Sequence, residues 1–373
     1  MLGIKSRAFQ LNLKANECKQ LGKFNKAEEY VRESIRLDPT FAEAYSNLGT
    51  ILISLEKFPE AKESISKAIE LRPHYRNAIW NLFLLSEDIE QASKHLEHCL
   101  SINKNDIPAL LHLSAVKLHQ GNNLLYEKLL EKYTNKDPLL ESLEWVSTLP
   151  KIPELFFYRE LFYDEMVKRS IPNRPFYEFG VYEGDSFNYL IKGLKKGFGF
   201  DTFTGLPEAW NQFHKGDFST AGKTPNIEGG TFISGHFEDT LPEFFDGTKP
   251  LASILHFDAD LYSSTICALN HAKSVIDKNT ILIFDEFIAH ETWKENEYQA
   301  LDTFCSQNNL DYEVIAVSYA TCQAAVRIDI PCDPVEEYFS CVSECYLADP
   351  ECEEQCVTQL KESPDPQLDV CSF

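Results

Sequence analysis

The second half of the chain begins with the stretch "PFYEFGVYEGDSFNYLIKGL", residues 175–194. Its apolar start, which ends at Phe179, predicts a buried strand, and Gly180 and Gly184 predict a tight turn after it. The amphipathic spacing of residues 185–194 predicts a helix. A strand, a glycine turn and a helix in this order are typical of the first unit of an alternating α/β domain.

The same alternation continues to about residue 330. Further apolar runs lead into Asp201, Asp258 and Asp285, and stretches with helical spacing separate them. The final run, "YEVIAVSYATCQAAVRI", predicts two closing strands. We therefore expect a Rossmann-like, doubly wound and mostly parallel sheet over residues 176–330. Ligands bind such sheets at the carboxyl ends of the strands, where the acidic residues of this domain stand.

The first third of the chain is an internal repeat. Ala27 and Ala61 are 34 residues apart, as are Pro39 and Pro73, and two less regular copies follow. This period resembles that of tetratricopeptide repeats, which form an α-solenoid, and we expect one over residues 1–134. A repeat fold alone does not identify the ligand that it binds. A protein partner on the repeat surface and a packing element for the neighbouring domain both remain open.

Two further segments complete the predicted organisation. Residues 135–175 carry several prolines and the aromatic run "ELFFYRELFYDEMVKR", which predicts a linker with a helix packed on the next domain. Residues 331–373 hold eleven acidic residues, one lysine and six of the eleven cysteines. The α + α/β chain is therefore expected to end in a short, acidic, Cys-rich helical tail.

The cysteines of this tail stand in "CVSECYLADPECEEQC", where each C-x₃-C places two sulfurs on one helix face. A helical hairpin would pair Cys341 with Cys356 and Cys345 with Cys352. Free thiols and a four-cysteine zinc site are the alternatives. The spacing differs from that of common zinc fingers, so we favour a structural hairpin, as disulfide or thiol.

The charge balance narrows the range of partners. The chain has 35 Lys and Arg against 58 Asp and Glu, a formal net charge of −23. An acidic surface repels nucleic acid and anionic membranes, so we expect neither as a partner. No apolar run reaches the ~18 residues of a membrane span, and the first residues lack a signal-peptide core. We expect a cytoplasmic protein, and a homo-oligomer is compatible with the sequence.

The glycine turn carries the pattern E-x-G-x-x-x-G-x-S, formed by Glu178, Gly180, Gly184 and Ser186. Glycine permits close approach of a ligand, and the amides at the following helix start can hold an anionic group. The dinucleotide pattern G-x-G-x-x-G is absent from this turn. Asp201, at the end of the next predicted strand, is placed to accept ribose hydroxyls. Together these features indicate an adenosine-bearing cofactor without a pyrophosphate, which describes S-adenosylmethionine.

Four carboxylates follow two later strands. Asp258 and Asp260 lie in "FDADLYSST", and Asp285 and Glu286 lie in "FDEF". Asp260 could cap the following helix, and the Asp285–Glu286 pair could be a solvated loop. Two acid pairs on neighbouring strands of one fold favour a metal site instead, and Mg²⁺ prefers oxygen ligands of this kind.

Five motifs in sequence order carry a resemblance: "YEFGVYEGDS", "GFDTFTGLPEAW", "GHFEDTLP", "FDADLYSST" and "FDEF". They resemble class I S-adenosylmethionine-dependent methyltransferases and, more narrowly, the macrocin O-methyltransferase-like family, over about residues 176–328. The resemblance implies Mg²⁺-dependent methylation of a sugar or glycan hydroxyl. A methyltransferase with a non-sugar acceptor and a repeat scaffold with an inactive domain are the alternatives.

The resemblance also assigns roles to residues. It implies that Asp258, Asp285 and Glu286 bind the metal and that Asp260 is the catalytic base. Glu286 departs from the family, which usually has Asp there. The candidate cofactor-binding residues are Glu178, Gly180, Gly184, Ser186, Asp201, Phe237 and Asp258.

Three further side chains near these motifs are ambiguous. We expect His256 to be a packed or hydrogen-bonded core residue rather than a ligand. Trp210 and Phe213 lie in the polar stretch "AWNQFHKGDFSTAGKTPNIEGG", which is typical of a lid. They could close over the sulfonium or the sugar, or they could only pack within the lid.

Overall fold

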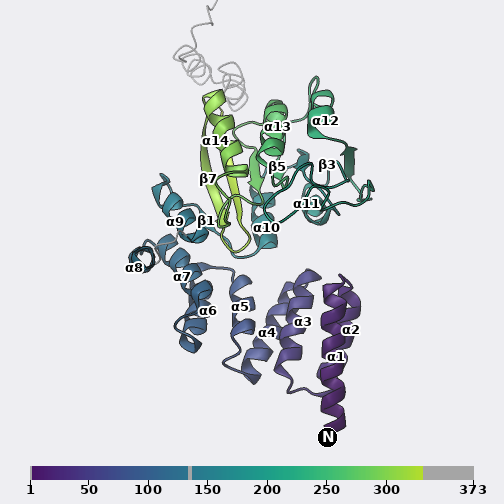
Figure 1. Cartoon of the computed structure of the whole chain (residues 1–373), viewed down its shortest axis with the longest axis vertical. Helices are drawn as coiled ribbons and strands as arrows, with labels where there is room; N and C mark the ends of the chain where they lie inside the picture. The colour runs from purple at the N-terminus through teal and green to yellow at the C-terminus, as the bar shows by residue number, and fades with distance from the viewer. Residues whose placement is uncertain (1, 133–136, 331–373) are drawn as a thin grey trace, which may run out of the picture.

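The computed structural model describes residues 2–132 and 137–330, and the predicted Cys-rich tail lies outside these residues. Figure 1 shows a row of helices below an α/β domain that contains a twisted sheet. The predicted combination of an α-solenoid with a mostly parallel, doubly wound sheet is confirmed for the described residues.

The lower part is built from helices that pair with their neighbours in sequence order. These are α1 (Leu2–Gln20), α2 (Phe24–Leu37), α3 (Ala42–Ser54), α4 (Phe58–Leu71), α5 (Arg76–Leu84), α6 (Ile89–Ile102), α7 (Ile107–His119), α8 (Leu124–Lys132) and α9 (Pro138–Thr148). Small residues allow the close pairing: Ala27 and Ala61 are fully buried. A Cβ on Gly49 would stand 2.3 Å from Cγ1 of Ile65, so the α3–α4 contact requires glycine there.

The upper part contains one sheet of eight strands in the order β1-β7-β8-β6-β5-β2-β3-β4. Its strands are β1 (Glu154–Leu155), β2 (Phe176–Phe179), β3 (Gly197–Asp201), β4 (Gly230–Ser234), β5 (Ile254–Phe257), β6 (Ile281–Phe284), β7 (Asp311–Ser318) and β8 (Gln323–Asp329). All neighbouring pairs are parallel except those that involve β8, which runs antiparallel to β6 and β7. The central strands β2, β5 and β6 are buried along their whole length, as the apolar runs predict.

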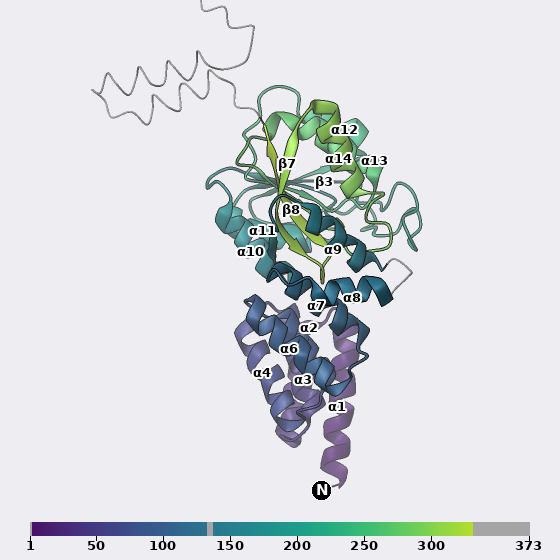
Figure 2. The same ribbon diagram turned by 90° about the vertical axis from the view of Figure 1, so that its left-hand side faces the viewer.

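Helices cover both faces of the sheet. They are α10 (Arg159–Arg169), α11 (Asp185–Leu194), α12 (Phe237–Phe244), α13 (Tyr262–Ala272) and α14 (Glu297–Asn308), with a short 3₁₀ turn at Lys273–Val275. Figure 2 shows α10 and α11 on one side of the sheet and α12, α13 and α14 on the other. The segment predicted as a linker with a packed helix contains α9, the edge strand β1 and the covering helix α10.

The repeat helices and the sheet share one apolar core, which runs without interruption from α5–α9 into β5, β6 and β8. Phe83 of α5 packs on Phe157 with ring centroids 5.5 Å apart. His119, at the end of α7, makes a 3.1 Å hydrogen bond between Nε2 and the Tyr319 hydroxyl. The two parts are joined by buried contacts rather than by a linker alone.

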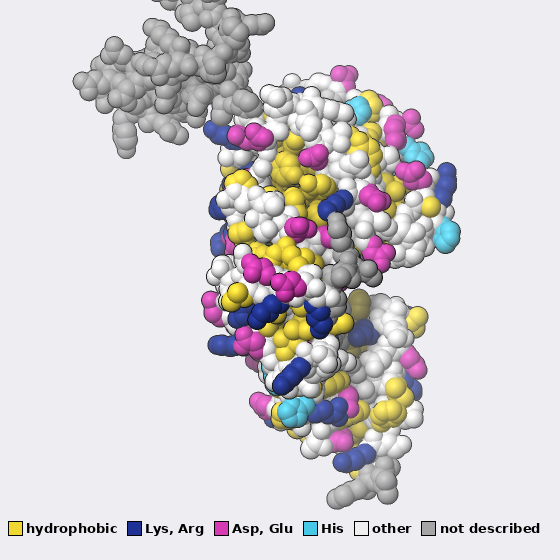
Figure 3. All heavy atoms as spheres, turned by 60° about the vertical axis from the view of Figure 1, so that its left-hand side comes forward, with side chains coloured by type: hydrophobic (Ala, Val, Ile, Leu, Met, Phe, Trp, Pro, Cys, Tyr) yellow, Lys and Arg dark blue, Asp and Glu magenta, His cyan; other side chains and the backbone are white. Residues whose placement is uncertain are grey.

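Acidic side chains are not confined to one part of the visible surface. In Figure 3, Asp and Glu side chains are spread over both the repeat part and the α/β part of the visible face. Of the helices described, none has the length and apolar character that crossing a membrane requires.

Candidate functional site

The candidate site is a cavity of about 660 Å³ at the carboxyl ends of β2, β3, β5 and β6. It is lined by Arg159, Gly180, Val181, Tyr182, Asp201, Thr202, Gly205, Leu206, Pro207, Glu208, Trp210, Phe213, Phe218, His236, Phe237, Glu238, Asp258, Ala259, Asp260, Ser263, Ser264, Asp285 and Glu286. This is the edge at which doubly wound sheets bind their ligands. The cavity brings together Gly180, Asp201, Phe237 and all four predicted acids.

The glycine turn after β2 is pressed against the end of β5. Gly180 has a φ of +90°, and a Cβ there would lie 1.8 Å from the carbonyl oxygen of Asp258. No other residue fits this position, because both the backbone angle and the contact exclude a side chain. Gly184 adopts the left-handed conformation at the N-cap of α11. The turn therefore places its backbone directly beside Asp258.

Three predicted cofactor residues do not line the cavity: Glu178, Gly184 and Ser186. Glu178 and Ser186 support the turn from the core of the sheet. Glu178 is fully buried, and its Oε1 accepts a 3.0 Å hydrogen bond from the Ser186 hydroxyl. Its Oε2 lies 3.1 Å from Nδ1 of His256. Burial raises the pKa of Glu178, while the His256 and Ser186 contacts lower it. Glu178 and Ser186 therefore connect the turn to the sheet core.

Asp201 holds the same turn from the β3 side. Its Oδ2 accepts hydrogen bonds of 2.8 Å from the amides of Val181 and Tyr182, and its Oδ1 accepts one of 2.7 Å from the Phe203 amide. The sequence predicts that this carboxylate accepts hydrogen bonds from ribose hydroxyls, whereas in the structure it accepts them from backbone amides. Asp201 still lines the cavity.

Three carboxylates form a cluster with few partners: one oxygen each from Asp258, Asp260 and Glu286, all within 4.8 Å of one another. Burial and the neighbouring charges raise the pKa values of Asp258 and Glu286 well above the ordinary values for carboxyl groups. Burial, Asp285 and Asp201 raise the pKa of Asp260 to about 7. Oε2 of Glu286 is buried without a hydrogen-bond partner, and Asp260 has a φ of +61°.

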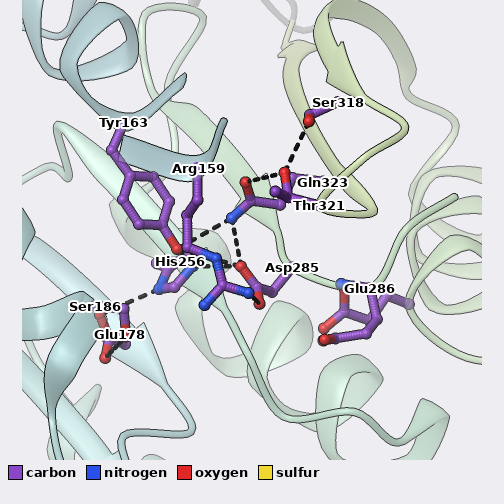
Figure 4. A network of polar contacts seen from close by, with 11 residues as sticks. Arg159, Tyr163, Glu178, Ser186, His256, Asp285, Glu286, Ser318, Thr321 and Gln323 are labelled. Atoms are coloured by element: carbon purple, nitrogen blue, oxygen red, sulfur yellow. Dashed lines mark hydrogen bonds and ion pairs between the residues drawn. The ribbon is translucent and has the colours of Figure 1, made fainter. Parts of the chain in front are cut away.

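Asp285 has the opposite surroundings. Arg159 donates from Nη2 to its Oδ2 at 2.7 Å, and Tyr163 donates from its hydroxyl to Oδ1 at 3.2 Å. Nε2 of Gln323 also donates to Oδ1. Figure 4 shows these groups converging on Asp285 while Glu286 points away from them. Burial raises the pKa of Asp285, but Arg159, His256 and Gln323 outweigh burial and lower it.

His256 lies between two buried carboxylates, with Nδ1 at 3.1 Å from Glu178 and Nε2 at 3.8 Å from Asp285. It is fully buried and hydrogen-bonded, as expected from its position in the strand. Burial lowers the pKa of an imidazole, but Asp285 and Glu178 raise that of His256 to about 10. An imidazolium therefore stabilises both acids across the central strands.

The predicted metal-ligand set is divided in the structure. Two clusters share Asp258: one contains His256 and Asp285, and the other contains Asp260 and Glu286. Asp285 and Glu286 fall into different clusters, because consecutive residues after a strand point in different directions. The structure therefore groups Asp260, predicted as the base, with the predicted ligands Asp258 and Glu286. The third predicted ligand, Asp285, forms an ion pair with Arg159.

Sequence reasoning missed Arg159, Tyr163 and Gln323. Arg159 and Tyr163 lie in the aromatic run before β2, which was expected only to pack on the domain. The available signal was Arg159 itself, a cationic residue whose immediate neighbours are aromatic and acidic. Gln323 starts β8 and is fully buried, which is unusual for an amide side chain without a specific partner.

Four aromatic side chains pack in a row along the lining of the cavity. Trp210 and Phe213 stack with centroids 5.6 Å apart, Phe213 packs on Phe218 at 4.7 Å, and Phe218 packs on Tyr182 at 5.8 Å. All four line the cavity. His214, from the same stretch, is largely exposed and does not line it. The aromatic residues pack within the segment and also face the cavity.

The donors of the open cluster fit a divalent cation. Asp258, Asp260 and Glu286 offer oxygen atoms, which are the ligands that Mg²⁺ prefers. Partly buried carboxylates with raised pKa values and an unpartnered oxygen are relieved by a positive charge. The cofactor space also fits a nucleoside, since the Gly180 turn, Phe237 and polar groups surround the same cavity.

Comparison with protein families identifies the domain. Residues 228–323 match the family described as Macrocin-O-methyltransferase (TylF), a span that contains all four acids. The chain carries a macrocin O-methyltransferase-like domain. Residues 11–41 and 42–75 match tetratricopeptide repeat models, which confirms the predicted repeats. Residues 335–366 match a domain of unknown function and lie outside the described residues.

Solved structures resemble each part separately. The calicheamicin methyltransferase CalS11 is 19% identical, with 57% of this chain and 91% of that chain covered and a TM-score of 0.39. The first tetratricopeptide domain of Spaghetti (RPAP3), bound to an HSP90 peptide, is 21% identical, with 32% and 96% covered and a TM-score of 0.30. The Arabidopsis OM64 tetratricopeptide domain is 19% identical, with 31% and 98% covered and a TM-score of 0.30. A search of curated proteins found no match.

Proposed function

We propose that the protein is an S-adenosylmethionine-dependent O-methyltransferase that acts on a hydroxyl of a sugar or glycosylated small molecule, assisted by Mg²⁺. The observation that carries this proposal is the cluster of Asp258, Asp260 and Glu286 beside the Gly180 turn, within one cavity. The match to the macrocin-O-methyltransferase family supports the reaction class and the type of acceptor.

Proton removal is the chemical task of Asp260. A sugar hydroxyl is a poor nucleophile because its pKa lies far above neutral, so its proton must leave as the new bond forms. A carboxylate with a pKa near 7 is a better acceptor than an ordinary aspartate, because a general base works best near the operating pH. In the proposed reaction an Asp260 oxygen receives the proton of the acceptor hydroxyl.

Asp258 and Glu286 are the residues that would hold the cation, with Asp285 engaged by Arg159. A bound Mg²⁺ would supply positive charge that lowers the pKa of an acceptor hydroxyl. Glu286 is one methylene longer than the family's usual aspartate. The Glu286 side chain therefore extends further into the cluster than an aspartate would, while the Asp285 side chain is held in the buried network.

Gly180, Asp201 and Phe237 line the part of the cavity that would hold the cofactor, whose sulfonium carries the methyl group. The Gly180 turn and Asp201 form a preorganised loop, because the Asp201 carboxylate bonds two of its amides. A rigid loop beside Asp258 and Asp260 orients both reactants, and orientation contributes much of the rate in bimolecular reactions.

Trp210 and Phe213 supply the surface for the acceptor. Aromatic faces contact the apolar faces of sugar rings, and both side chains line the cavity that contains the acids. We also propose that the repeat surface binds a protein partner and that the protein is located in the cytoplasm.

The test is isothermal titration calorimetry with S-adenosylhomocysteine, with and without Mg²⁺, on the full chain. Wild type should bind the ligand, and Asp258→Ala should lose Mg²⁺ binding. Asp239→Ala removes an exposed acid of α12 outside the cavity and is the matched control. A wild-type protein that does not bind S-adenosylhomocysteine would overturn the enzyme proposal. Unchanged Mg²⁺ binding in Asp258→Ala would remove only the metal assignment.

A further inference from the structure

Arg159 is the one Lys or Arg side chain among the described residues that line the cavity. Its guanidinium makes a 2.7 Å ion pair with Asp285, and its side chain is 40% exposed, whereas Asp285 is 2% exposed. The charges of Asp258 and Glu286 also act on it. The cavity thus contains a cation of the protein itself, at the edge of the acid cluster.

The contacts of Asp285 leave little room for a metal ion beside Arg159. One oxygen accepts from Arg159, and the other accepts from Tyr163 and Gln323, both of which are buried. Tyr163 and Gln323 are neutral donors fixed by the core. Arg159 is the partly exposed partner and the charged one that faces the cavity, so a metal ion that approaches Asp285 must displace the guanidinium.

The residues directly before Arg159 contact the repeat array. Arg159 is the first residue of α10, and the two residues before it are anchored on the repeats. Phe157 packs on Phe83 of α5 at 5.5 Å, and Tyr158 packs edge-on against Phe58 of α4 at 5.8 Å. A shift of these rings moves the backbone of Arg159 directly, because consecutive Cα atoms are only ~3.8 Å apart.

We propose that Arg159 is a positioning residue, a tethered cation that competes with a divalent metal for Asp285, and that the repeat array sets its position through Phe157 and Tyr158. The proposal rests on the proposed function for the identity of the metal site. With Arg159 on Asp285, the metal is held by Asp258 and Glu286. With Arg159 withdrawn, Asp285 becomes a further ligand and the metal binds more tightly.

The first test measures binding of Mn²⁺ alone to the full chain, from the signal of the free ion in electron paramagnetic resonance. Arg159→Gln should bind Mn²⁺ about tenfold more tightly than wild type, because an opposing charge is removed and Asp285 becomes accessible. Arg159→Lys keeps the charge and should stay close to wild type. Unchanged or weaker Mn²⁺ binding in Arg159→Gln would overturn the proposal, since a merely structural role predicts weaker binding.

The second test connects Arg159 to the repeats. Tyr158→Ala removes the ring that packs on Phe58 and should tighten Mn²⁺ binding in the wild-type background. In the Arg159→Gln background the same change should have no effect, because the side chain that it repositions is absent. Tyr158→Phe keeps the ring and should match wild type. Equal shifts in both backgrounds, or no shift in either, would exclude control through this segment.

Binding of S-adenosylhomocysteine separates this proposal from the proposed function. If wild type fails to bind it but the Mn²⁺ affinities differ as expected, the enzyme proposal fails and the competition between Arg159 and the metal stands. If S-adenosylhomocysteine binds but the Mn²⁺ affinities are equal, the competition fails alone. Circular dichroism melts of each variant show that the compared proteins are folded.

Discussion

Asp285 and Glu286 are neighbours in sequence, yet their surroundings are opposite. Asp285 is almost fully buried and has Arg159, Tyr163, Gln323 and the His256 imidazolium as partners. Glu286 faces the cavity, and its Oε2 has no hydrogen-bond partner. Its pKa is raised by burial and by the surrounding carboxylates, while that of Asp285 is lowered.

These opposite surroundings distinguish residues that support the site from residues that can bind a ligand or a proton. A buried charge that is fully paired stabilises the arrangement in which it is found, but it has little capacity left for a ligand. Unpaired acids held close together are destabilising by themselves and gain most from a cation or a proton. The network around Asp285 is therefore the scaffold of the site, and Asp258, Asp260 and Glu286 form its reactive part.

The largest effect is expected from the reactive part. Asp260→Asn should lower kcat by about 10²–10⁴-fold, because the amide cannot accept the hydroxyl proton. Binding of S-adenosylhomocysteine should stay at the wild-type level. The assay is transfer of a labelled methyl group to a panel of glycosides, with Asp239→Asn as the control. Full activity in Asp260→Asn would place the base elsewhere.

The scaffold is tested by removing its central cation. His256→Phe should lower the free energy of unfolding by about 3–5 kcal/mol, because Glu178 and Asp285 then remain buried without their imidazolium. Denaturant unfolding at neutral pH measures the change. A loss below about 1 kcal/mol would show that these acids do not depend on His256 and would weaken the distinction between scaffold and reactive part.

Glu286→Gln is expected to change the free energy of unfolding in the opposite direction to His256→Phe. It removes one carboxylate from a group of buried, closely spaced acids and should raise the free energy of unfolding of the metal-free protein, because burial and the neighbouring acids disfavour the charged form of Glu286. Thermal melts with and without Mg²⁺ test this: added Mg²⁺ should stabilise wild type but not the variant. A destabilised Glu286→Gln protein would mean that Glu286 also belongs to the scaffold.

The last prediction concerns the joint between the repeats and the sheet, and its effect is absent at neutral pH. Burial lowers the pKa of His119 from its ordinary value of 6.5 to about 4, despite a hydrogen bond to the Pro153 carbonyl. The unfolded chain therefore binds a proton that the folded chain rejects, so stability is lost as the pH falls from 6.5 towards about 4. His119→Gln should remove this part of the acid sensitivity, measured as the change in unfolding free energy across that window. An identical pH profile would show that His119 does not titrate there.

The fold followed from local patterns. The 34-residue period predicts the paired helices of the repeats because Gly49, Ala27 and Ala61 permit the close contacts that the period repeats. Apolar runs separated by helical stretches predict the parallel sheet. The edge strand β1, within the segment predicted as a linker with a packed helix, was not predicted, because two residues are too few to show a period.

The positions of the four acids at strand ends were predicted, but their grouping was not. The sequence places Asp258, Asp260, Asp285 and Glu286 at strand ends, and the structure puts them in one cavity. The division between the paired and the open acids was not predictable, because it depends on which way each side chain turns after its strand and on a cation from another element.

What the sequence determined by itself is what short-range chemistry controls: the repeat period, the order of strands and helices, the glycine turn and the acids that follow β5 and β6. Only the tertiary structure decided which acid is neutralised. Arg159 and Asp285 are 126 residues apart, and Glu178 and His256 are 78 apart. Such pairs form because parallel strands and the covering helix α10 bring distant residues to one edge, where burial makes an unpaired charge costly.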